Sequence, residues 1–143
     1  MESPDFGPTR SPDALLRAVL GSKPVIAIVG ASSNSSRPSH DVMAGLLGAG
    51  YDVIPVNPNE REILGHVCYP DLASIPRRVD VVDVFRRREH LAGVARAAVA
   101  VGARVLWLQL GLADAEAEGI ARSGGLVVIA DRCTLVEHHR LFG

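Results

Sequence analysis

The chain has 143 residues, of which 48% are hydrophobic and 22% are charged, and its formal net charge is -1. A chain of this length fits one domain, and its near-neutral charge lacks the basic excess that binding to nucleic acid or to an anionic membrane usually requires. It contains no apolar stretch long enough to span a bilayer, and its first twenty residues carry acids and a proline instead of a secretion signal, so we expect a cytoplasmic protein without nucleic-acid or membrane partners.

The N-terminal part of the sequence divides into an arm and the start of a domain. Residues 1–10 are rich in Pro, Ser and Gly and are expected to form a flexible arm ahead of a single domain at 11–143. Ser11-Pro12-Asp13 predicts a helix start, because serine can cap, proline fits the first turn and an acid suits the positive end of the helix dipole. The helix is expected to end at Gly21, and residues 25–29 form the first buried strand.

Strand and helix patterns alternate along the rest of the chain. Further strands are expected at 53–56, 79–85, 105–110 and 126–130, and apolar residues recur at helical spacing over 42–47, 91–98 and 113–122. This alternation favours right-handed βαβ units. We therefore predict an α/β fold, a Rossmann-like, doubly wound parallel sheet of five strands in the order 3-2-1-4-5 with helices on both faces. Each strand ends at a small, polar or cationic cluster, and a ligand is expected at the edge where these endings meet.

The cluster after the first strand is a candidate phosphate-binding loop. Gly30, Ala31 and Ser32 lie between a strand and a helix, where backbone amides and the helix N-terminus can accept a pyrophosphate. Ser33 would add a hydroxyl donor and Arg37 a cation, although a tight turn capped by serines would also explain these residues. Serines at 32 and 33 stand where a dinucleotide fingerprint needs further glycines, so the expected ligand is phosphorylated without being an obvious nicotinamide cofactor.

Two further clusters follow the second and third strands. Asn57-Pro58 can be a stiff turn, or Asn57 can hydrogen-bond a nucleotide beside the phosphate loop. The absence of an acid there, which would hold ribose hydroxyls, makes an NAD(P)-binding oxidoreductase the weaker alternative. After the third strand, Arg86 is a candidate anion ligand and Phe85 a flat apolar wall, whereas Arg87 and Arg88 are typical of a solvated surface.

The last two strands carry residues with mixed interpretations. Trp107 is typical of a core, and Gln109, an amide in an otherwise apolar strand, needs a partner from the backbone or from a ligand. Asp131-Arg132 is expected to form a structural ion pair. Thr134 and Glu137 have the spacing of a capping box at the start of a helix.

The cysteines and histidines do not predict a metal site. Cys68 and Cys133 have no CxxC spacing, which agrees with a reducing compartment. A metal would require Cys133, His138, His66 or Cys68 to converge, and nothing in their spacing demands it. We therefore expect no bound metal.

Together, in this order, the motifs VGAS with RPS, VNP, VDVFR, WLQLG and DRC followed by Glu137-His138 resemble the small stand-alone CoA-binding proteins. That family is similar to the CoA-binding domain of the succinyl-CoA synthetase α-subunit. The resemblance covers about residues 24–142 and implies a Rossmann-like fold that holds coenzyme A across the carboxyl edge of its sheet. The candidate contacts to coenzyme A are Gly30, Ala31, Ser32, Ser33, Arg37, Pro38, Asn57, Pro58, Phe85, Arg86, Gln109 and Gly111.

The chain departs from the family pattern in two places. Such proteins often carry a lysine after the Asn-Pro motif, whereas residues 59–61 are Asn, Glu and Arg, so only Arg61 is left to supply that charge. A second lysine often follows the DRC motif, where this chain has Thr134 and Leu135. The phosphohistidine of the synthetase belongs to a second domain that this chain is too short to contain. The resemblance therefore implies a binding module for coenzyme A or an acyl-CoA, with no self-contained catalytic machinery.

Two functional alternatives stay open at the level of sequence. In the first, the protein is an enzyme acting on CoA thiols or thioesters, with Cys133 as nucleophile or mixed-disulfide partner near a helix end and His138 as base. In the second, it lends its CoA site to a separate ligase as a partner subunit. A homodimer through flat helical faces is also plausible.

Overall fold

The computed structural model describes residues 11–143, so the arm predicted at 1–10 lies outside the described residues. Five parallel strands form the main sheet, namely β1 (Val25–Val29), β2 (Asp52–Val56), β5 (Val81–Val84), β6 (Val105–Leu108) and β7 (Val127–Ile129). The helices are α1 (Pro12–Gly21), α2 (Pro38–Gly48), α3 (Arg88–Ala100), α4 (Ala115–Ser123) and α5 (Thr134–Phe142). The predicted Rossmann-like α/β class with a five-stranded parallel sheet is confirmed.

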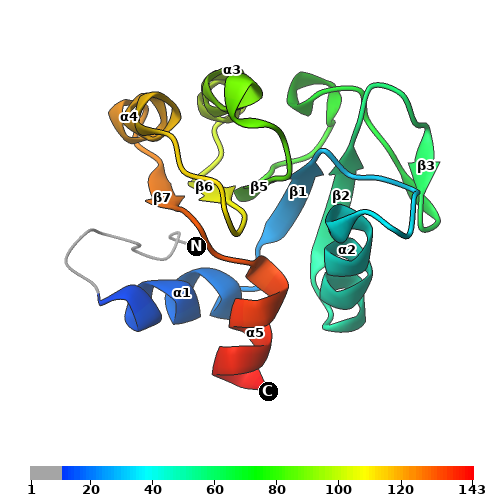
Figure 1. Cartoon of the computed structure of the whole chain (residues 1–143), viewed down its shortest axis with the longest axis horizontal. Coiled ribbons are helices and arrows are strands. Elements are labelled where there is room, and N and C mark those ends of the chain that lie inside the picture. The colour runs from blue at the N-terminus through cyan, green and yellow to red at the C-terminus, as the bar shows by residue number, and fades with distance from the viewer. Residues whose placement is uncertain (1–10) are drawn as a thin grey trace.

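The helices cover both faces of this sheet and divide the core into two halves. Figure 1 shows α1, α2 and α5 on one side of the strands and α3 and α4 on the other. Leu16 of α1 and Met43 of α2 belong to the first cluster of buried side chains, and Leu91 of α3 belongs to the second. Trp107 of β6 is fully buried in the first cluster, as predicted, and its indole Nε1 donates to the carbonyl oxygen of Arg132 at 2.8 Å. Strands buried from both sides explain the long apolar runs in the sequence.

The predicted strand order is wrong at one position. The sheet runs β2-β1-β5-β6-β7, which is 2-1-3-4-5 when its strands are counted along the chain, instead of 3-2-1-4-5. The third strand, β5, pairs with β1 and not with the outer side of β2. All four residues of β5 are buried, which suits a central position. The first βαβ unit therefore has β1 as a central strand and β2 as an edge.

Pro55 accounts for the edge position of β2. Proline has no N–H to donate, so within sheets it is largely confined to edge strands. The carbonyl of Pro55 accepts from the Tyr69 amide at 3.1 Å on the outer side, and the Asn57 amide donates to the Tyr69 carbonyl at 2.9 Å. The connection from β2 to β5 thus closes the open edge, which limits unwanted strand pairing.

That connection contains a small hairpin that the sequence patterns did not predict and a short helical turn. A two-stranded antiparallel hairpin forms from β3 (Glu62–Ile63) and β4 (His66–Val67), and a short 3-10 helix, η1 (Leu72–Ser74), follows it. Within residues 11–143, no helix is both long enough and apolar enough to cross a membrane. The same residues bring together no group of three or more His, Cys, Asp or Glu side chains that could hold a metal ion.

Candidate functional site

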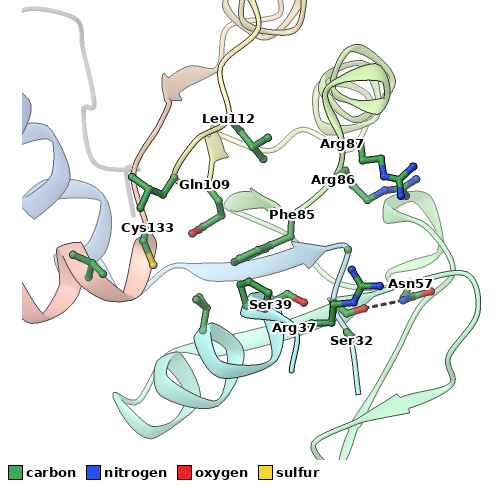
Figure 2. Close-up of a pocket in the computed structure, with 16 residues that line it drawn as sticks. Ser32, Arg37, Ser39, Asn57, Phe85, Arg86, Arg87, Gln109, Leu112 and Cys133 are labelled. Atoms are coloured by element: carbon green, nitrogen blue, oxygen red, sulfur yellow. Dashed lines mark hydrogen bonds between the residues drawn. The ribbon is translucent and has the colours of Figure 1, made fainter. Parts of the chain in front are cut away.

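A cavity of about 800 Å³ lies at the carboxyl edge of the sheet, between the loops that follow the strands and the ends of α2 and α5. It brings together nine of the residues expected from sequence, namely Gly30, Ala31, Ser32, Arg37, Pro38, Asn57, Phe85, Arg86 and Gln109. Figure 2 shows the polar and apolar side chains of this set facing one space. The expectation that the strand endings meet at one edge is met by this geometry.

Three expected residues do not line this cavity. The Ser33 amide donates to Glu60 Oε2 at 3.0 Å, and Pro58 lines a separate hollow of about 240 Å³ beside η1 and α3. Gly111 has a φ of +86°, and its amide donates to Asp131 Oδ1 at 2.7 Å. Gly111 therefore shapes the turn after β6 and does not reach the cavity.

Several lining residues were not among the candidate contacts. They are Ser39, Val42, Arg87, Leu110, Leu112, Cys133 and Val136. Arg87, expected to be a purely solvated charge, lies beside Arg86 at the cavity wall (Figure 2). Val42 and Val136 come from helices, and only the way α2 and α5 pack beside the loops places them there. In the sequence they look like the ordinary apolar residues of a helix, so no local signal marks them as cavity-lining residues.

Gly30 holds the loop after β1 close to the neighbouring strand. Its φ is +91°, a conformation that side chains rarely adopt, and a Cβ atom added here would lie 2.3 Å from the Phe85 carbonyl oxygen. The amides of Gly30 and Ala31 donate to the Val56 carbonyl at 3.1 and 3.3 Å. Two of the amides that the phosphate-loop prediction relied on are thus engaged within the fold.

The remaining loop is held by short polar contacts. The Asn34 amide donates to Ser32 Oγ at 3.0 Å, and Asn34 Oδ1 in turn accepts from the Ser36 amide at 2.9 Å. Asn57 donates through Nδ2 to the Ala31 carbonyl at 2.8 Å and accepts the Asn59 amide on Oδ1 at 2.8 Å. Asn57 therefore ties the second loop to the first, which combines the turn role and the cavity-lining role considered for it.

Three arginines give the cavity a cationic end. Arg37, Arg86 and Arg87 lie on one side in Figure 2, and Cys133 lies at the opposite side, with Phe85 between them. None of the three arginines forms an ion pair with another residue of 11–143. Their charges are free to meet an anionic ligand, and guanidinium groups suit phosphate oxygens.

A buried polar cluster fixes the side chain of Gln109. Its Nε2 donates to Asp83 Oδ1 and, at 3.0 Å, to Thr134 Oγ1, while the Thr134 hydroxyl donates to Asp83 Oδ2 at 2.9 Å. The partner expected for Gln109 is thus supplied by two side chains. Because Nε2 donates to these two buried residues, the side-chain carbonyl oxygen of Gln109 lies on the cavity side (Figure 2). Gln109 thus presents a hydrogen-bond acceptor to the cavity.

Asp83 is fully buried in the middle of β5, and burial raises the pKa of its carboxyl to about 7, while the hydrogen bonds from Gln109 and Thr134 act in the opposite direction. Between about pH 4 and about pH 7, the Asp83 carboxyl is therefore protonated in the folded protein and ionised in the unfolded chain. This group makes the fold less stable as pH rises through that window, by a few kcal/mol.

Asp83→Asn removes the titrating carboxyl, so we expect it to remove this part of the pH dependence of the free energy of unfolding. Urea unfolding of the wild type and the variant at pH 4.5 and pH 7.5 measures the difference. The free energy of unfolding of the variant relative to the wild type should rise between these two pH values. An identical pH dependence for the two proteins would contradict the assignment.

Two expectations for the start of α5 are wrong. Thr134 does not form a capping box with Glu137, because its hydroxyl serves Asp83, and the N-cap position is Cys133, without a side-chain cap. Asp131 does not pair with Arg132. Arg132 binds Glu137 instead, and Asp131 accepts the Gly111 amide. The sharp turn at Asp131, whose φ is +58°, explains why neighbours in sequence point apart.

The proposed nucleophile and base are not brought together. Cys133 lines the cavity, but His138 does not. His138 is buried, and its Nδ1 lies 2.7 Å from the Tyr51 hydroxyl between α5 and the start of β2. Burial lowers the pKa of His138. His138 therefore has a structural role in the core.

Known proteins are similar to this chain in sequence or in fold. A family model described as a CoA binding domain matches residues 24–139. The uncharacterized protein YneT of Bacillus subtilis is 40% identical over 125 residues, which cover 87% of this chain and 93% of YneT. A solved structure of a hypothetical protein from Pyrococcus horikoshii is 38% identical with a TM-score of 0.90, covering 100% of this chain and 99% of that chain. An ADP-forming acetate–CoA ligase of Archaeoglobus fulgidus is 40% identical over 57 residues, which cover 40% of this chain and 8% of the ligase.

Proposed function

Since this chain belongs to the CoA-binding domain family, we propose that it binds coenzyme A or an acyl-CoA in the cavity at the carboxyl edge of its sheet. In this proposal it acts as a cytoplasmic binding module and has no catalytic machinery of its own. The observation that carries the proposal is the polarity of the cavity. Three arginines that form no ion pair within residues 11–143 gather at one end, and the other end is apolar.

The two ends of the cavity match the two ends of the ligand. Coenzyme A carries a pyrophosphate and a 3′-phosphate on its nucleotide half, which Arg37, Arg86 and Arg87 can neutralise. The pantetheine arm is uncharged and contains two amides. It would run past the ring of Phe85, and an amide N–H can donate to the carbonyl oxygen of Gln109. The thiol then lies toward Cys133.

The same geometry supports binding over catalysis. The catalytic alternative pairs Cys133 with His138 as its base, but His138 is bonded to Tyr51 away from the cavity, so this pair is not assembled. A nicotinamide cofactor is also poorly matched, because Asn57 stands where an acid would hold the ribose and its side chain is already bonded to the Ala31 carbonyl and the Asn59 amide.

Isothermal titration tests this proposal directly. Coenzyme A is expected to bind with one site per chain, and NAD should give no saturable binding under the same conditions. The folded state is checked beforehand by circular dichroism, so that a negative result refers to folded protein. Tight binding of NAD with no binding of coenzyme A would replace the proposal with a redox function.

Glu60 opposes the ligand's charge at the phosphate loop. Its carboxylate accepts the Ser33 amide at 3.0 Å, which puts a negative charge on the loop that would face phosphates. We expect Glu60→Gln to tighten coenzyme A binding by roughly fivefold at low ionic strength, because about 1 kcal/mol of repulsion is removed, and by less in high salt. Titration at two salt concentrations measures this change.

Glu62→Gln is the matched control, since it removes an exposed carboxylate from β3, two residues along the chain. Its effect on the dissociation constant should be smaller than that of Glu60→Gln. Unchanged or weaker binding by Glu60→Gln would show that this carboxylate does not oppose the ligand.

A further inference from the structure

The end of the cavity away from the arginines exposes two large apolar side chains. Leu110, in the turn after β6, is 71% exposed, and Val136, in the first turn of α5, is 59% exposed. Both line the cavity together with Cys133. Among the residues of 11–143, large hydrophobic side chains this exposed are few. Two of them at one end of a ligand cavity indicate that something apolar covers them.

A second hollow adjoins the cavity at Cys133. This second hollow has a volume of about 460 Å³ and shares Leu110, Cys133 and Val136 with the main cavity. Its remaining lining is Ala130 and three charged residues, Asp131, Arg132 and Glu137, which include the Arg132–Glu137 ion pair. The second hollow therefore combines apolar side chains, which it shares with the cavity, with a polar lining of its own.

We propose that the physiological ligand is an acyl-CoA carrying a short apolar acyl chain, which lies on Leu110 and Val136. This inference rests on the proposed function, because it requires coenzyme A to lie with its phosphates at Arg37, Arg86 and Arg87 and its sulfur near Cys133. A free thiol would leave the two apolar side chains in water. A chain of a few methylenes covers them and stops before the polar lining of the second hollow.

The geometry also separates acyl recognition from coenzyme A recognition. Leu110 and Val136 line the second hollow together with Cys133, which lies on the side of the cavity opposite the arginines (Figure 2), so in this proposal they contact the acyl group and not the nucleotide. Complete burial of one methylene group increases affinity roughly fourfold. Because this surface is only partly enclosed, we expect butyryl-CoA to bind roughly tenfold more tightly than coenzyme A.

The test compares coenzyme A, butyryl-CoA and hexanoyl-CoA by isothermal titration against the wild type and Val136→Ser. In the wild type, both acyl-CoAs should bind more tightly than coenzyme A. In Val136→Ser, the preference for butyryl-CoA over coenzyme A should fall to roughly threefold or less. Val67→Ser is the matched control, because Val67 is 62% exposed on β4 and lines neither hollow.

The outcomes distinguish this inference from the proposed function. Equal affinity for the three ligands overturns the acyl-chain assignment but leaves coenzyme A binding intact. Equal weakening of all three ligands by Val136→Ser overturns it as well, because Val136 would then act on the common part of the ligand. Failure of every ligand to bind folded wild-type protein overturns the proposed function, and the acyl-chain assignment with it.

Discussion

Replacement of Arg86 by alanine is expected to weaken coenzyme A binding by roughly 10- to 100-fold, because hydrogen bonds to charged groups contribute about 1.5–3 kcal/mol each. Arg86 follows β5 at the cationic end of the cavity and has no ion-pair partner among residues 11–143 that its loss would disturb. The loss should therefore appear in the dissociation constant and not in the thermal stability. Titration calorimetry with a parallel melting curve measures both.

Arg96→Ala provides the matched control. Arg96 is an exposed arginine on α3, and it lines neither the candidate cavity nor the hollow beside η1. Its removal changes the net charge by the same amount, so long-range electrostatics are equal to first order. Equal effects of the two substitutions would show that the protein's overall charge, and not a local phosphate contact, controls binding.

Gly30→Ala is expected to lower the free energy of unfolding by about 2–4 kcal/mol and to abolish measurable binding of coenzyme A. The left-handed conformation at +91° costs about 1–2 kcal/mol for a residue with a Cβ atom, and the contact of 2.3 Å with the Phe85 carbonyl forces the backbone to shift. Such a shift moves the loop away from β5 and displaces Phe85. Urea unfolding and titration measure the two effects.

Gly119→Ala is the control for adding a methyl group to a glycine. Gly119 lies inside α4, its φ is not positive, and a Cβ atom there meets nothing within 4 Å. In an exposed helix interior this change should stabilise the protein by about 1 kcal/mol. If Gly30→Ala behaved like Gly119→Ala, the close approach of the two loops would not be required.

The alternation of strands and helices predicted the fold class because each pattern depends on local residues. The place of β5 beside β1 did not follow from this alternation, since neighbours in a sheet are chosen by long-range packing. One local signal was available. Pro55 within the second strand indicates an edge, which excludes a third strand outside it.

The loops after β1, β2 and β5 were well predicted because each carries a recognisable polar cluster directly after an apolar strand. The far end of the cavity was not, since Leu110 and Val136 look like ordinary apolar residues in the sequence. Asp83 was also missed, although an acid in the middle of a buried strand is unusual and calls for a partner. The sequence indicated that Gln109 needs a partner, but it did not identify Asp83 as that partner.

The distribution of hydrogen bonds around Thr134 explains the failed expectations for α5. A capping box was predicted from spacing alone, but the hydroxyl is drawn to the buried carboxyl of Asp83. Glu137 is instead placed between Arg132 and Arg140. The buried hydrogen bonds of Asp83 take precedence here over the helix-capping tendency of Thr134, because leaving buried polar groups unpaired is costly.

Native mass spectrometry of the purified protein, followed by mass analysis of whatever denaturation releases, tests coenzyme A binding most directly. The proposed function predicts that the released molecule is an acyl-CoA or coenzyme A, and the acyl-chain inference predicts a short-chain acyl-CoA. Release of an adenine dinucleotide would contradict both. So would a protein that is empty and then fails to take up added coenzyme A or butyryl-CoA while folded.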